Sequence, residues 1–169
     1  MNLRNLANKR SIIIIPIALF VFLFSARCSD NNNDFKNEIL MILLNCQGGT
    51  MAFTQGTLRS WTCCRAVNHG TYWEVVGSSG SEAVQLFIGN ASVGLHNTST
   101  LISHEYIIFS SGGINFYGVT DSPYVSGSST INVTTNNSTT IVGTFNGTVY
   151  ANGGSTNRVI TLGTFTAFK

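Results

Sequence analysis

The C-terminal stretch SSTINVTTNNSTTIVGTFNGTVYANGGSTNRVITLGTFTAFK, residues 128–169, decides the fold class of this chain. Polar and apolar residues alternate in three runs of it, at residues 129–135, 140–150 and 158–167. Alternation with a period of two, built from β-branched and aromatic residues, is typical of half-buried antiparallel strands. The Asn- and Gly-rich connections suit tight hairpin turns, where the backbone needs positive φ. The stretch therefore predicts three consecutive antiparallel strands.

The middle run gives the clearest assignment of side chains to a face. Five of its residues share one face at a spacing of two: Ile141, Gly143, Phe145, Gly147 and Val149. We expect the three large ones to face the interior. The two glycines leave room for a large neighbour, and we expect Phe165 of the last run to occupy it. In that last run, alternation puts Ile160 and Leu162 on one face and Val159 and Phe165 on the other.

Three motifs follow one another in this stretch. They are Thr130-Ile131-Asn132-Val133 after Ser126-Gly127, then Val142-Gly143-Thr144-Phe145-Asn146-Gly147, then Val159-Ile160-Thr161-Leu162-Gly163-Thr164-Phe165. They resemble, in order, the GxIxIT, GTFsf and vxITxGxF strands of a family of small Bacteroidetes lipoproteins of unknown function. The resemblance covers roughly Thr50 to the end of the chain. It implies an all-β lipoprotein domain and supplies no known active site.

Six further runs lie upstream, separated by Gly- and Ser-rich turns. They occupy residues 51–54, 58–67, 71–76, 83–88, 104–109 and 115–119. Many short strands with regular turns predict a single antiparallel β-sandwich of about eight to nine strands, with a closed β-barrel as the alternative. The longest connection, residues 89–103, is either a functional loop or a further strand.

The N-terminus has the pattern of an export signal. Residues 1–10 carry three basic side chains and no acid, and residues 11–26 are almost wholly apolar. A basic region followed by such a stretch is typical of a secretory signal peptide, here residues 1–27. The stretch is shorter than the ~20 residues that span a bilayer, and an uncleaved membrane anchor stays the alternative.

Cys28 directly follows the predicted signal peptide, residues 1–27, and precedes a polar, acidic tether. This arrangement resembles bacterial lipoprotein signals, which implies that Cys28 carries the lipid and that the chain is an outer-membrane lipoprotein of the cell envelope. Arg27 stands where these signals have a small residue, so the cleavage site stays open. Cys46 is the weaker candidate for acylation.

The domain boundary is expected near residue 50. Residues 28–49 contain the tether and a short apolar segment, residues 35–44, which suits either a short helix or a first strand. Gln47, Gly48 and Gly49 then interrupt the pattern, and the all-β domain takes residues 50–169.

Composition and motifs narrow the class of function. Charged residues make up 9% and hydrophobic residues 43% of the chain, which is too apolar for a disordered protein. The domain has four basic and four acidic side chains, so nucleic-acid binding is disfavoured. The sequence has no HExxH motif, no Cys pair at zinc-site spacing and no nucleophile elbow. We therefore expect no enzyme, no metal and no cofactor.

Cys63 and Cys64 are adjacent, so on a strand they would face opposite sides. One of them could pair with Cys46, and buried thiols are the alternative.

Four aromatic residues are candidates for stacking on sugar rings: Trp61, Trp73, Tyr117 and Tyr124. Aromatics at strand positions also serve as core or cross-strand pairs, so both interpretations stay open. The sequence thus predicts a lipid-anchored envelope protein with a non-catalytic binding or structural module, whose partner is a glycan or an envelope protein. The alternative is a secreted hydrolase with an unrecognised active site.

Overall fold

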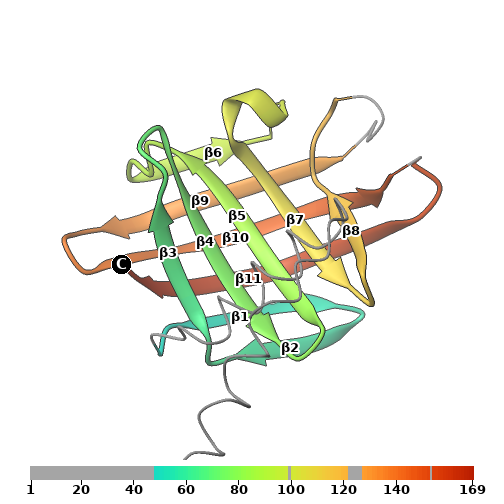
Figure 1. Ribbon diagram of the computed structural model, residues 1–169, viewed down its shortest axis with the longest axis horizontal. Coiled ribbons are helices and arrows are strands. Elements are labelled where there is room, and N and C mark those ends of the chain that lie inside the picture. The colour runs from blue at the N-terminus through green and yellow to red at the C-terminus, as the bar shows by residue number, and fades with distance from the viewer. Residues whose placement is uncertain (1–47, 99, 122–126, 153) are drawn as a thin grey trace, which may run out of the picture. The chain divides into compact units, whose positions relative to one another are not determined.

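A computed structural model describes residues 48–98, 100–121, 127–152 and 154–169, and these residues form an all-β structure (Figure 1). Their eleven strands are β1 (Thr50–Gln55), β2 (Thr57–Trp61), β3 (Cys64–Asn68), β4 (Tyr72–Ser79), β5 (Glu82–Gly89), β6 (Gly94–Asn97), β7 (Glu105–Ser111), β8 (Ile114–Tyr117), β9 (Ser128–Asn136), β10 (Thr140–Ala151) and β11 (Asn157–Phe168). A short 3₁₀ turn, Leu101–Ser103, precedes β7.

The strands lie in two layers that cross each other (Figure 1). The front layer has the order β3-β4-β5-β7-β8, and the back layer has the order β2-β1-β11-β10-β9-β6. The layers are joined at two corners. Phe168 of β11 pairs with Arg65 of β3 in parallel, and β10 pairs with β8 through Tyr150 and Tyr117. The predicted all-β antiparallel sandwich is confirmed, with corner pairings that link its layers into one sheet.

The core lies between the two layers and is filled by alternate residues of each strand. Phe53, Phe109 and Phe145 are at most 1% exposed and come from both layers. The Phe53 ring centroid lies 6.1 Å from that of Phe109 and 6.0 Å from that of Phe145. Because aromatic rings bury the largest apolar areas, this group is the centre of the core.

The predicted strand 58–67 is two strands that belong to different layers. β2 pairs with β1 in the back layer, whereas β3 pairs with β4 in the front layer. Trp61 and Cys64 both point into the core, although their spacing of three breaks the alternation of a continuous strand. The chain therefore changes layer at Thr62 and Cys63.

The long connection 89–103 contains a strand, which resolves the alternative left by the sequence. β6 pairs with β9 at the edge of the back layer. His96 is its one buried residue, and the other three positions carry no alternating apolar pattern. Strand pairing alone defines this element, so periodicity could not reveal it.

The expected faces of β10 are correct. Ile141, Phe145 and Val149 are at most 1% exposed. A Cβ atom added to Gly143 would lie 2.8 Å from Cζ of Phe165, so this ring occupies the space that the glycine leaves. The arrangement is reciprocal, because a Cβ at Gly163 would lie 2.7 Å from the Phe145 ring.

The expected faces of β11 are partly wrong. Ile160 and Phe165 both point into the core, while Leu162 is 81% exposed. Between Phe165 and Ile160 the register of β11 shifts against both β1 and β10, and Leu162 has a φ of 53°. One extra residue in a bulge inverts the inward–outward alternation beyond it. The prediction from strict alternation, which placed Leu162 on the same face as Ile160, is therefore wrong for Leu162.

Candidate functional site

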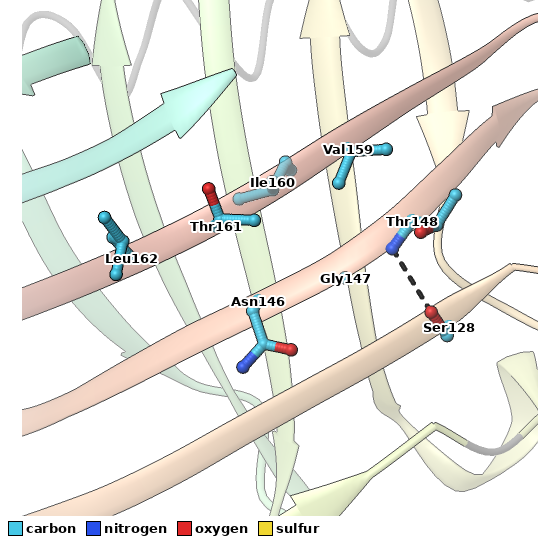
Figure 2. Close-up of a pocket in the computed structure, with 8 residues that line it drawn as sticks. All are labelled: Ser128, Asn146, Gly147, Thr148, Val159, Ile160, Thr161 and Leu162. Carbon is cyan, nitrogen blue, oxygen red and sulfur yellow. Dashed lines mark hydrogen bonds between the residues drawn. The ribbon is translucent and has the colours of Figure 1, made fainter. Parts of the chain in front are cut away.

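The β11 bulge forms one wall of an open groove on the outer face of the back layer (Figure 2). The groove has a volume of about 340 Å³ and is lined by residues of β9, β10 and β11: Ser128, Asn146, Gly147, Thr148, Val159, Ile160, Thr161 and Leu162. This volume falls at the lower end of the roughly 300–1,000 Å³ that is usual for ligand sites.

The side chains of the groove are neutral. Asn146 offers an exposed amide, and Thr148 and Thr161 offer hydroxyls. Ser128 Oγ accepts a hydrogen bond of 3.2 Å from the backbone N–H of Thr148, which holds β9 against β10 at this point. Val159 and Leu162 add exposed methyl groups, at 54% and 81% exposure. The lining contains no acid, base or nucleophilic thiol, so it is suited to binding rather than to acid–base chemistry.

The backbone at Leu162 is strained. A left-handed conformation costs an L-residue with a bulky side chain about 1–2 kcal/mol. Such strain is concentrated at functional sites, where the surrounding structure maintains it. Here the β-ladder on both sides of β11 maintains it, and the result is a leucine side chain turned toward solvent at the groove.

The aromatic residues that the sequence nominated are not gathered at this groove. Trp61 is buried in the core, 5.0 Å from the Phe53 ring centroid in an edge-on contact, so its ring is not accessible to a ligand. Trp73 packs against the core, and its ring centroid lies 4.6 Å from Nζ of Lys169. Tyr117 packs on the opposite, front layer beside Tyr106. Tyr124 lies outside the described residues. The three described aromatics thus do not share one face, and Trp61 takes the core role that the sequence left open as the alternative.

A second cluster, on the outer face of the front layer, was not predicted. Tyr72 is stacked between His69 and His104, with centroid distances of 4.6 and 4.1 Å. His69, an exposed residue of the turn between β3 and β4, also places Nε2 2.9 Å from Oε2 of Glu74. Gln85 Nε2 donates a 2.7 Å hydrogen bond to Oε1 of Glu74. Tyr72 and Glu74 are two residues apart on β4, so their side chains lie on the same face of the sheet. This spacing is the sequence signal that could have revealed the cluster.

His104 and Glu105 are adjacent in the sequence, but their side chains contact different residues. His104 has a φ of 54° and stacks on Tyr72, whereas Glu105 Oε1 lies 3.3 Å from Nδ1 of His96. Among the described residues, no three His, Cys, Asp or Glu side chains lie close enough together to hold a metal ion.

Among the described residues, three groups have shifted pKa values, and none of them lines the groove. Hydrogen bonds from Arg59 hold the pKa of Glu82 below its usual value, and the same contacts raise the pKa of Arg59. The two side chains meet as a fork, with Nε–Oε2 at 2.8 Å and Nη2–Oε1 at 3.0 Å. Burial raises the pKa of Tyr106 to about 12. These groups do not converge on one pocket, so they do not form a catalytic constellation.

The cysteines divide between described and undescribed parts of the chain. Cys28 and Cys46 lie outside the described residues, so acylation and a bridge to Cys46 stay predictions. Cys64 is buried in the core, and Cys63 is half-buried.

No helix in the described ranges is both long and apolar enough to span a bilayer. No family model, curated protein or solved structure matches the chain.

Proposed function

We propose that the chain is an exported, lipid-anchored protein of the cell envelope whose β-sandwich binds a neutral glycan in the groove of β9, β10 and β11. The observation that carries the proposal is the bulge at Leu162. It turns a leucine side chain toward solvent at a left-handed backbone position, beside a groove of amide and hydroxyl groups.

The chemistry of the lining favours a glycan over a charged ligand. A sugar ring presents hydroxyls around its edge and C–H groups on its faces. Asn146, Thr148 and Thr161 can donate to and accept from such hydroxyls. Val159 and Leu162 supply methyl groups for the C–H faces. With no cation or carboxylate in the lining, an anionic or cationic polymer would lose its hydration without gaining a partner.

The anchoring part of the proposal rests on the sequence. Cys28 follows the apolar stretch after one residue, Arg27, and precedes a polar tether, an arrangement that resembles acylated export signals. Labelling with a fatty-acid probe should mark the natural chain and fail for Cys28→Ser. Loss of labelling with Cys46→Ser instead would move the anchor to that residue.

The binding part is tested with the full-length chain purified in detergent, against neutral and acidic envelope polysaccharides. We expect binding to neutral glycans, weakened at least about tenfold, or about 1.4 kcal/mol, by Asn146→Ala and by Leu162→Asp. Thr164→Ala is the matched control, because Thr164 is exposed on β11 but lies outside the groove. Equal affinities for all variants would refute the assignment of the glycan site to this groove. Release of reducing ends from the glycan would instead assign the chain to the hydrolase class.

A further inference from the structure

The outer face of the back layer is built from strands that carry almost no charge. Strands β1, β6, β9 and β10 contain no Asp, Glu, Lys or Arg, and β2 and β11 contain one arginine each. Arg59 of β2 bonds with Glu82 of the front layer. Arg158 of β11 reaches toward the core, with its guanidinium 5.0 Å from the ring centroid of Phe116. Typical soluble surfaces have about 25–35% charged residues, so this face is suited to a neutral partner.

The strand register aligns outward residues of this layer into one row, the cross-strand row, which passes over all six strands. From β6 to β2 the row consists of Asn97, Thr130, Asn146, Thr161 with Leu162, Thr54 and Leu58. In the middle of the row, Asn146 faces the two bulge residues Thr161 and Leu162 (Figure 2). Neighbouring strands lie about 4.8 Å apart, so the spacings between the strands give the row a length of about 24 Å.

The cross-strand row combines hydrogen-bonding groups with exposed apolar side chains. Within the described part of the chain, the amide of Asn146 and the hydroxyls of Thr54 and Thr161 make no hydrogen bond to another residue. Leu162 is 81% exposed and Leu58 is 74% exposed, and the row has them on either side of β1. A ligand that contacts the whole row must therefore repeat polar and apolar groups along its length.

We propose that a linear neutral polysaccharide lies along the cross-strand row, perpendicular to the strands, with one of its sugars in the groove. This inference rests on the function proposed above and extends its site beyond the groove. The row and the groove share Asn146, Thr161 and Leu162, so a chain seated in one continues onto the other. A sugar ring in a linear polymer has nearly the length of one strand spacing, so successive rings meet successive strands.

The chemistry of the row matches such a polymer along its whole length. Each ring offers hydroxyls to the amides of Asn97 and Asn146 and to the threonine hydroxyls. The C–H faces of the rings pack on Leu162 and Leu58. An acidic polysaccharide would bring carboxylates to strands that supply no outward cation, and these carboxylates would lose water without gaining a partner.

A second copy of the chain fits this face less well than a glycan. Sheets that pack face to face interdigitate apolar side chains. The outward residues beside the row are polar, as Asn132, Thr144 and Thr164 show, and they pair across β9, β10 and β11. Packing of two such faces would bury amides and hydroxyls without matched partners.

Binding measured against chain length tests the proposal with the full-length chain in detergent. The probes are linear neutral oligosaccharides of glucose, mannose and galactose, either about two sugars long, which the groove alone can hold, or about six sugars long, one for each strand. We expect the long chains of at least one series to bind at least about tenfold more tightly than the short ones. Asn97→Ala and Leu58→Asp, at the two ends of the row, should remove this gain and leave the binding of short chains unchanged.

Thr144→Ala is the matched control, because Thr144 is exposed on the same face of β10 as Asn146 but lies outside the row. It should leave both affinities unchanged. Equal affinities for short and long chains, or full affinity of Asn97→Ala and Leu58→Asp for long chains, would overturn the extension and confine the glycan to the groove. Failure of the natural chain to bind either length would instead refute the function proposed for the groove. A dimer of the natural chain that Leu58→Asp dissociates, measured by light scattering, would assign the row to a contact between copies and would also overturn the proposal.

Discussion

Replacing Phe145 with alanine tests how β10 is seated in the core. Phe145 is 1% exposed, and its ring centroid lies 6.0 Å from that of Phe53 and 6.3 Å from that of Phe165. It also fills the space above Gly163, where an added Cβ would lie 2.7 Å from the ring. Removal of the ring leaves a cavity that glycine has no side chain to close.

The expected loss follows from this geometry. A buried phenylalanine truncated to alanine costs about 3–5 kcal/mol of unfolding free energy. Phe145 should fall in the upper half of that range, because its cross-strand partner is Gly163. Thr144→Ala is the matched control, since Thr144 is the preceding residue and is exposed on the opposite face. Its loss should stay below about 1 kcal/mol, the span of β-propensity effects at exposed strand positions.

Urea unfolding of the chain from Ser29 onward, followed by circular dichroism, measures both losses. The comparison holds only if the slopes of the two transitions agree, because a changed slope means a changed denatured or native state. Against a typical total of about 5–15 kcal/mol, Phe145→Ala could unfold the domain outright. Equal and small losses for the two variants would refute the face assignment of β10.

Two further predictions concern the surface. Leu162→Gly should stabilise the protein by up to about 1 kcal/mol, because glycine adopts a φ of 53° without strain and removal of the exposed leucine side chain loses little packing. Urea unfolding measures this change in stability, and a destabilised variant would contradict the conclusion that the backbone at Leu162 is strained. Glu82→Gln should destabilise by about 0.5–1 kcal/mol at pH 7. Because the folded pKa of Glu82 is lowered, its contribution is present above the unfolded pKa and is lost as the pH falls through the folded pKa. The difference between the natural chain and Glu82→Gln should therefore shrink at pH 3, and a constant difference would contradict the sign.

The candidate site was within reach of the sequence only in part. The residues of the groove all lie in the C-terminal stretch, and all but Ser128 lie in its predicted strands, but nothing in their pattern marks Leu162 as the extra residue of a bulge. Leucine at positive φ runs against local preference, so only the pairing of β11 with β1 and β10 imposes it. The role of Trp61 could not be settled from the sequence for a related reason. Aromatic residues serve both for stacking on a ligand and for packing in a core, and Trp61 packs in the core.

The sequence by itself determined the all-β class, most of the strands and the inward face of β10. These follow from local alternation, which each strand carries within a few residues. The tertiary structure decided the division of residues 57–68 between two layers, the strand β6, the bulge at Leu162 and the groove beside it. Each of these depends on which strands become neighbours. Strand neighbours are set by contacts between residues far apart in the chain, and a periodic pattern within one strand carries no information about its partner.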